Sequence, residues 1–281
     1  MRKIAIVPTL LTLGNGVCGF VAITLASKVL PTGVDDETEK YFLIAGLFII
    51  GAMVFDMLDG YVARLSKTAS KFGGELDSLC DAISFGVAPA FLILKMGPGW
   101  EPRPIVHQIV AGIAALYMVC TILRLARFNV DNTPDPAAHK RFRGLPSPGA
   151  AGCIASLAIL RGGVPNKLAD YWGLAILQET RTALEQFVEI AAPLGGLVVA
   201  LLMVSIVPYP HITKQWLRGR QHVWHLIQIC IGVFIVLLMR EIALVLVFWG
   251  YALGLPIRHL IVKHLLKDPT MTPRLDDVLP R

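Results

Sequence analysis

Long runs of apolar residues constrain the fold of this chain more than any other feature of its sequence. A transmembrane helix needs about 20 mostly apolar residues, and about eight segments approach this length. They cover residues 9–30, 41–64, 77–95, 105–125, 147–161, 188–207, 223–239 and 242–255. Hydrophobic residues make up 55% of the chain and charged residues only 16%, which excludes a soluble fold and a disordered chain. We therefore predict an all-α, polytopic membrane helical bundle.

Charged residues between the predicted spans indicate the orientation of the chain. The segments after the second, fourth and sixth spans are basic, whereas the segment after the first span is acidic. The basic residues are Lys67, Lys71, Arg127, Lys140, Arg141, Arg143, Lys214, Arg218 and Arg220, and the acidic ones are Asp35, Asp36, Glu37 and Glu39. Because basic loops stay in the cytoplasm, we predict an even number of spans and two cytoplasmic termini. The net charge of +6 then favours contact with anionic lipid, not nucleic acid.

The two ends of the chain have simple structural interpretations. A basic start precedes the first apolar run, but Asn15 and several glycines interrupt this run, so we expect no cleaved signal peptide. Residues 257–267 place apolar side chains on one helical face and charges on the other. This pattern predicts an interfacial amphipathic helix, within a basic cytoplasmic tail over 257–281.

Cysteine usage gives no sign of a disulfide framework or a zinc site. The five cysteines lie inside apolar stretches and lack CxxC or Cys/His spacing. We expect them to be small, buried packing residues. They are Cys18, Cys80, Cys120, Cys153 and Cys230.

The most informative stretch, residues 55–85, carries four aspartates at the facing ends of the second and third predicted spans. A charged side chain at the centre of a membrane helix costs about 2.5–3.5 kcal/mol on insertion scales, so these aspartates need an explanation. Asp56 and Asp59 are three residues apart, and Asp77 and Asp81 are four apart, so each pair projects from one helical face. The short connection makes the two helices antiparallel neighbours. We expect four carboxylates to converge near the cytoplasmic surface.

Carboxylates this close repel each other unless a cation lies between them. Oxygen ligands favour hard divalent ions, Mg²⁺ or Mn²⁺ above all, and Cys80 is expected to point away from the aspartates. Small residues on the same helices leave room for a phosphate-bearing ligand, and Arg64 supplies a cation for it. The small residues are Gly60, Ala63, Gly73 and Gly74. The pattern indicates phosphoryl chemistry in which two ions neutralise a pyrophosphate.

Each of these features alone also has a structural explanation. A single intramembrane aspartate often makes a packing hydrogen bond, and small residues in membrane helices usually allow close packing. Four aspartates at these spacings, with glycine, alanine and arginine at fixed places between them, favour a functional site.

The core of this stretch resembles the signature of the CDP-alcohol phosphotransferase family at every defined position. It reads Asp56-x-x-Asp59-Gly60-x-x-Ala63-Arg64, then eight residues, then Gly73-x-x-x-Asp77-x-x-x-Asp81. The resemblance implies an integral membrane enzyme that transfers a substituted phosphate from a CDP-linked donor to an alcohol and releases CMP.

The same resemblance implies a role for each motif residue. Asp56, Asp59 and Asp77 would bind two divalent ions, and Asp81 would be the general base and also a ligand. Gly60, Ala63 and Gly73 would make room for the CDP group, and the Arg64 guanidinium would lie beside it.

Three further stretches resemble the phosphatidylserine synthase branch of the family. They are Thr12-Leu-Gly-Asn15-Gly16, Ser84-Phe-Gly-Val-Ala-Pro89, and Arg124-Leu-Ala-Arg127-Phe-Asn129 followed by Phe142-Arg-Gly-Leu-Pro146-Ser-Pro148. This implies CDP-diacylglycerol and L-serine as substrates, and a six-span core with about two extra C-terminal spans. We divide the chain accordingly into a core over 1–207, an added hairpin over 208–256 and the tail. The family resemblance and Gly250-x-x-x-Gly254 favour a homodimer.

Three polar residues near these motifs have two interpretations each. Arg124 and Arg127 lie on one face at the cytoplasmic end of the fourth span, where they either anchor the helix or hold the donor phosphates or the acceptor carboxylate. Asn15 either makes a hydrogen bond between helices or contacts a substrate.

Two alternatives to serine transfer remain open from the sequence. The same chemistry could use glycerol 3-phosphate or inositol phosphate as the acceptor, because the basic residues near span four could bind a phosphate. A divalent-cation transporter is the second alternative, but its ion site would be expected near the bilayer midplane and within repeated halves. The carboxylates lie instead beside a basic loop that we place in the cytoplasm. In a bacterium the site would then be at the cytoplasmic face of the inner (cell) membrane.

Overall fold

The computed structural model describes residues 6–29, 36–66, 70–99, 103–131, 144–172, 174–205 and 240–265. Every regular element in these ranges is helical, which confirms the predicted all-α bundle. The elements are α1 (Ile6–Ser27), α2 (Asp36–Leu65), α3 (Lys71–Asp81), the π-helix η1 (Ala82–Val87), α4 (Ala88–Met96), α5 (Pro104–Asp131), α6 (Ser147–Trp172), α7 (Leu174–Val204) and α10 (Arg240–Leu265). The seventh predicted span and several predicted residues lie outside these ranges, namely Lys67, Lys140, Arg141, Arg143, Lys214, Arg218, Arg220 and Cys230.

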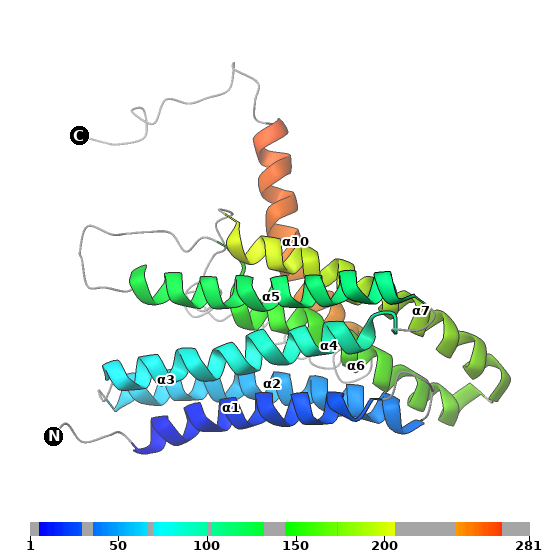
Figure 1. Cartoon of the computed structure of the whole chain (residues 1–281), viewed down its shortest axis with the longest axis horizontal. Coiled ribbons are helices and arrows are strands. Elements are labelled where there is room, and N and C mark those ends of the chain that lie inside the picture. The colour runs from blue at the N-terminus through cyan, green and yellow to red at the C-terminus, as the bar shows by residue number, and fades with distance from the viewer. Residues whose placement is uncertain are drawn as a thin grey trace, which may run out of the picture.

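The long helices α1 to α7 run roughly along one axis, with α1, α2 and α3 side by side (Figure 1). The helices α1 and α2 are antiparallel, because Gly14 faces Phe55 while Cys18 approaches Gly51 nearer the start of α2. By contrast, α3 and η1 run parallel to α1, and Gly19 packs against Ser84. The end of α2 and the start of α3 therefore lie at the same end of the bundle as the start of α1.

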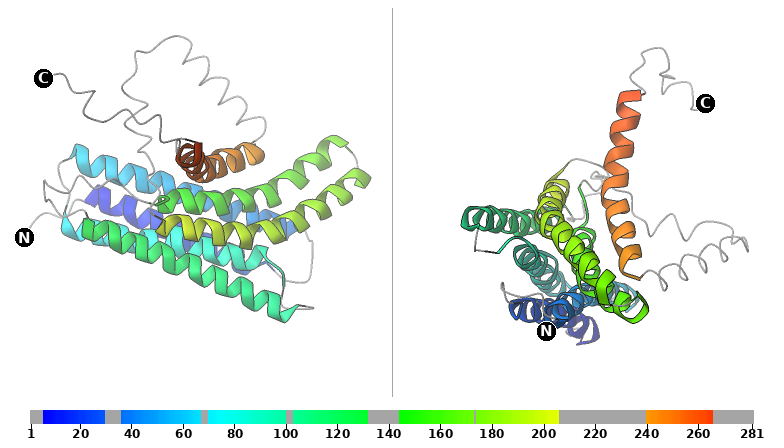
Figure 2. Two further views of the ribbon diagram at one scale, coloured as in Figure 1. Left: turned by 90° about the horizontal axis from the view of Figure 1, so that it is seen from above. Right: turned by 90° about the vertical axis from the view of Figure 1, so that its right-hand side faces the viewer.

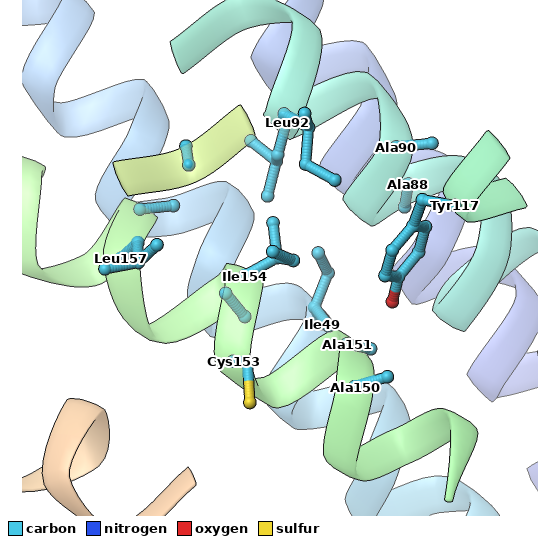
Figure 3. Close-up of a cluster of buried hydrophobic side chains, with 14 of the residues drawn as sticks. Ile49, Ala88, Ala90, Leu92, Tyr117, Ala150, Ala151, Cys153, Ile154 and Leu157 are labelled. Atoms are coloured by element: carbon cyan, nitrogen blue, oxygen red, sulfur yellow. The ribbon is translucent and has the colours of Figure 1, made fainter. Parts of the chain in front are cut away.

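The helix α6 forms the centre of the bundle. Every residue from 150 to 160 is buried, and Ile154 lies between Ile49 of α2 and Leu92 of α4 (Figure 3). Between Ser147 and Gly163, 11 of the 17 residues of α6 are Gly, Ala, Ser or Cys, so the neighbouring backbones approach closely. At Gly162, for example, an added methyl group would overlap the backbone of α2. Such contacts replace the hydrophobic driving force that is missing between helices in lipid.

A π-helix interrupts the third span directly after Asp81. Pro89 has no backbone N–H, so it cannot donate the helical hydrogen bond to the carbonyl of Phe85, four residues earlier. The carbonyl of Phe85 instead accepts a hydrogen bond of 3.1 Å from the hydroxyl of Tyr117 on α5. Tyr117 is fully buried, and the bond ties α5 to the rod formed by α3, η1 and α4. A widened turn of this kind often marks a functional site.

The last described helix, α10, crosses α6 at a steep angle, and its final turns extend beyond the bundle (Figure 1, Figure 2). Aromatic side chains of α10 fill spaces over glycines of α6 and α7: Phe248 lies at Gly152 and Trp249 at Gly195. The indole N–H of Trp249 also donates to the carbonyl of Cys153 at 3.1 Å. These contacts attach α10 firmly to the bundle.

Five helices in the described ranges are long and apolar enough to cross a membrane. They are Ile6–Ser27, Thr38–Leu65, Phe72–Met96, Pro104–Val130 and Thr182–Val204. The predicted eighth span corresponds to the shorter apolar helix Glu241–Gly254. The predicted fifth span corresponds to the first part of α6, which is rich in small residues and is buried by other helices. The protein is an integral, multi-pass membrane protein.

Several boundaries differ from the sequence-based expectation. The acidic residues 36–39 belong to the first turns of α2, not to a loop, and Glu39 is buried. The fifth predicted span ended at Arg161, but α6 continues to Trp172. Arg161 fits inside the bundle because its guanidinium lies over the ring of Phe42, 4.6 Å from the centroid, and donates to the carbonyl of Met96 at 3.3 Å. Residues 257–265 are helical, as predicted, but they continue α10 without a break; their location at the membrane interface stays a prediction.

We predict that Gly162→Ala destabilises the bundle. The added methyl group would overlap the backbone carbonyl of Glu39 and lie 2.7 Å from the backbone nitrogen of Leu43, so α2 and α6 would have to separate. Overpacking of this kind costs about 1–3 kcal/mol, which thermal unfolding in detergent micelles would detect. The matched control is Gly112→Ala on α5, where a methyl group meets nothing within 4 Å and alanine favours the helix. An equal loss in both variants would contradict the prediction.

Candidate active site

Three carboxylates meet where the end of α2 faces α3. One oxygen each from Asp56, Asp59 and Asp77 lies within 4.8 Å of the others. Asp56 and Asp59 project from the same face of α2 because they are three residues apart, and the short connection from α2 to α3 brings Asp77 opposite them. We call these residues the three-carboxylate group.

The oxygens of this group are suited to a cation. Asp59 Oδ2 and Asp77 Oδ1 are buried and have no hydrogen-bond partner among the described residues. Buried polar atoms of this kind are rare and call for a ligand or an ion. An all-oxygen donor set matches hard divalent cations, which neutralise the repulsion among the carboxylates. The Cys80 thiol lies instead against Gly16 of α1, 3.0 Å from the position of an added methyl group.

The surface beside the three-carboxylate group is open. Ser70 caps the start of α3, and its hydroxyl accepts a hydrogen bond of 3.0 Å from the N–H of Gly73. A methyl group added at Gly74 would meet nothing within 4 Å, and one at Gly60 would meet only the Arg64 guanidinium, at 4.0 Å. Arg64 is exposed, and Ala63 is partly exposed on the same turn. A ligand can therefore approach the backbone of both helices here.

The fourth aspartate of the motif, Asp81, lies outside the group of mutually close oxygens and is held by α1. Its Oδ1 accepts a hydrogen bond of 2.8 Å from Nδ2 of Asn15, and both side chains are buried. The Ser84 hydroxyl donates to the backbone carbonyl of Asn15, also at 2.8 Å. Asn15 thus makes the predicted hydrogen bond between helices, and its partner is the motif carboxylate.

The helix α5 brings Arg124 to the level of Asp81. Two contacts set the register of the antiparallel helices: Tyr117 reaches Phe85, and Nδ2 of Asn129 donates to Ser78 at 2.8 Å. Between them, Arg124 interacts electrostatically with Asp81. Its Nη1 donates to the hydroxyl of Ser147 on α6 at 2.8 Å.

Arg127 lies one turn further along α5 and is exposed. The structure thus brings Asn15 and Arg124 together at Asp81 and leaves Arg127 at the surface.

Several residues at the site were not singled out by sequence reasoning. Ser78, Ser84 and Asn129 occur in or next to the motifs, but hydroxyl and amide residues carry no spacing signal of their own. Tyr117 of α5 contacts η1, and Ser147 of α6 contacts Arg124. Each contact joins helices that are distant in the sequence. Only the tertiary structure identifies such partners.

The fold and the site define a class: a helical membrane protein with an open, carboxylate-rich centre at one end of the bundle. The family described as CDP-alcohol phosphatidyltransferase matches residues 5–178. This segment contains both helices of the three-carboxylate group and covers more than half of the chain. The protein belongs to this family.

Curated relatives share the sequence over much of this region. A protein of Helicobacter pylori is 33% identical over 211 residues, which cover 74% of each chain. One of Saccharomyces cerevisiae is 35% identical over 153 residues, covering 53% of this chain and 51% of its own, so the match spans about half of that relative. One of Bacillus subtilis is 28% identical over 210 residues, covering 74% and 92%. All three are named CDP-diacylglycerol–serine O-phosphatidyltransferase.

We predict that Asp77→Asn stabilises the cation-free protein and removes most of its stabilisation by divalent cations. The substitution keeps the side-chain shape but takes away one of three mutually repelling charges. A cation at 100 times its Kd stabilises a protein by about 2.7 kcal/mol. Thermal unfolding with and without MgCl₂ or MnCl₂ measures both effects. Glu75→Gln, an exposed carboxylate on the same helix, is the control and should keep the full cation response. An unchanged response in Asp77→Asn would count against a cation at this group.

Proposed function

We propose that the protein transfers the phosphatidyl group of CDP-diacylglycerol to L-serine and releases CMP. The observation that carries the proposal is the position of Asp81: a buried carboxylate held by Asn15 beside the three-carboxylate group, on the motif of a family whose relatives bear this activity in their names. The three-carboxylate group is suited to metal ions, and Asp81 is suited to accept a proton. One site therefore offers both the metal ligands and the base that the reaction requires.

In this proposal Asp56, Asp59 and Asp77 hold two divalent ions, Mg²⁺ or Mn²⁺, with Asp81 sharing one of them. The unpaired oxygens of Asp59 and Asp77 support this assignment. When bound, the ions supply electrostatic stabilisation of the pyrophosphate and of the phosphate that leaves with CMP.

The open surface beside these carboxylates fits the CDP group. Gly60, Ala63 and Gly73 leave the backbone accessible, and Arg64 extends from the same end of α2. An exposed guanidinium at this place can pair with a phosphate oxygen. The diacylglycerol chains would remain in the surrounding bilayer.

Asp81 acts as the general base. It accepts the proton of the serine hydroxyl while the serine oxygen forms a bond to the phosphorus atom of the phosphatidyl group, and the bond from that phosphorus to the oxygen of the CMP phosphate breaks. The hydrogen bond from Asn15 keeps one carboxylate oxygen in place and leaves the other for the proton. Asn15 and Arg124 contact the substrates from the other side of Asp81, whereas the exposed Arg127 anchors the end of α5 at the membrane surface.

We place this reaction at the cytoplasmic face of the membrane, the inner membrane in a bacterium, with both termini on the same side. The basic segments next to α2 and α5 support this orientation, because both helices end at the same end of the bundle as the three-carboxylate group. L-Serine and CMP are water-soluble and would exchange there directly.

Incubation of the purified protein with CDP-diacylglycerol tests the function directly. We expect CMP release that requires Mg²⁺ or Mn²⁺ and L-serine, and little release with glycerol 3-phosphate or inositol phosphate. Asp81→Asn should lower the rate by about 10²–10⁴-fold, since it removes the base, while most of the cation-induced thermal shift remains because Asp56, Asp59 and Asp77 still provide ligands. A folded Asp81→Asn protein with full activity would refute the assignment of the base. Cation flux without CMP release would favour a transporter.

We also propose that the protein is a homodimer in the membrane. Gly250 and Gly254 are exposed on α10, and a methyl group at either position would meet nothing within 4 Å, so a second copy can pack against them. Light scattering of the detergent-solubilised protein should give twice the protomer mass, and Gly250→Leu should shift it toward the monomer. A monomer at all concentrations would disprove this proposal.

A further inference from the structure

Two buried polar atoms beside Asp81 have no hydrogen-bond partner among the described residues. They are Oδ1 of Asn15, a residue with no exposed surface, and Nε of Arg124. Leaving such groups unpaired costs about 1–3 kcal/mol each, so native structures rarely do so without a reason. The rest of each side chain is fixed, because Asn15 Nδ2 is bound to Asp81 and Arg124 Nη1 to Ser147.

These two atoms have opposite hydrogen-bonding character, and they belong to side chains that interact with Asp81 from different helices. Asn15 extends from α1 and offers an acceptor. Arg124 extends from α5, at the level of Asp81, and offers the donor edge that includes Nε. A guanidinium edge of this type binds a carboxylate through two parallel hydrogen bonds. An amide oxygen next to a carboxylate is a suitable place for an ammonium group.

We propose that Asn15, Asp81 and Arg124 form a three-point binding site for a zwitterionic α-amino acid that carries a hydroxyl group. Arg124 binds the carboxylate, Asn15 Oδ1 accepts from the ammonium, and Asp81 accepts from the hydroxyl that reacts. The site rests on the proposed function, since it assigns the acceptor of that reaction. A phosphorylated alcohol does not match it, because an acceptor atom at Asn15 offers nothing to a phosphate dianion.

Tyr251 of α10 contributes to the surroundings of Arg124. Its ring lies against Gly149 of α6, with Cε1 3.4 Å from the position of an added methyl group. It also interacts electrostatically with Arg124. With Ser147 on the Nη1 atom and Tyr251 nearby, the guanidinium is restricted in its orientation, and its Nε edge remains for the acceptor.

Acceptor analogues test the proposal on the wild-type protein, without any substitution. Ethanolamine lacks the carboxylate of serine, and 3-hydroxypropionate lacks its ammonium. We expect each to be a poorer acceptor than L-serine by roughly 10- to 100-fold in kcat/KM, the effect of one lost charged hydrogen bond. Analogues that react within threefold of serine would overturn the proposal. Absence of CMP release with serine itself would instead refute the proposed function.

Two variants then assign each contact. Arg124→Gln should raise the KM for serine by at least tenfold, leave the KM for CDP-diacylglycerol within twofold, and reduce the preference for serine over ethanolamine. Asn15→Leu should reduce the preference for serine over 3-hydroxypropionate. Arg103→Gln and Thr24→Val, exposed polar positions on or next to the same helices, are the controls and should keep both preferences.

The outcomes separate a binding role from a structural one. A larger change in the KM for CDP-diacylglycerol than for serine in Arg124→Gln would overturn the site, because Arg124 would then serve the donor. Equal losses with serine and with the analogue that lacks the matching group would also overturn it. The cation-induced thermal shift shows that each variant is folded, and the analogue series on the wild type decides the proposal if a variant is not.

Discussion

Repulsion within the three-carboxylate group is the constraint that the surrounding helices have to accommodate. At separations up to 4.8 Å, each pair of charges repels by about 3 kcal/mol at an effective dielectric constant of about 20. This repulsion opposes the approach of Asp77 on α3 to Asp56 and Asp59 on α2 unless a cation is present. The helix α1 supports an aspartate on each of the two helices: Thr12 lies beside Asp59 of α2, and Asn15 holds Asp81 of α3. Because α1 contributes polar but uncharged groups, it positions the carboxylates and leaves their charge available for metal ions.

The π-helix η1 allows the continuous helical segment α3–η1–α4 to point its aspartates and its apolar residues in different directions. Asp77 and Asp81 need to face α1 and α2, whereas the apolar residues of α4, such as Leu92, need to face α6 (Figure 3). A regular helix would keep one face throughout. The wider turn after Asp81 changes the direction in which later side chains project. Pro89 removes a helical donor at this place, and Tyr117 supplies a replacement, so that the change of direction leaves no unpaired carbonyl at Phe85.

The sequence was sufficient for the helical class and for the approach of Asp56, Asp59 and Asp77. Helical spacing fixes the direction of side chains, and a short connection between two helices leaves few arrangements for them. The partner of Asp81 was not predictable, because Asn15 is 66 residues away and an amide in an apolar helix has many options. The predicted length of the fifth span, which corresponds to α6, was wrong for a similar reason. A charge such as Arg161 normally ends a span, and only the contact with Phe42 shows why it does not end this one.

The two sides of Asp81 differ in what they can specify. The side formed by α2 and α3 lies within the segment that the whole family shares, residues 5–178, and its carboxylates suit any CDP-linked donor. In our proposal the choice of acceptor comes from the opposite side, where Arg124 of α5, which also lies within that segment, contacts Ser147 of α6 and interacts with Tyr251 of α10. Tyr251 lies outside the shared segment, and its place depends on glycines of α6 that admit the aromatic residues of α10. Changes in α10 can therefore alter the surroundings of Arg124 while the metal ligands stay as they are. A division of labour of this kind allows one reaction to be kept while its alcohol changes.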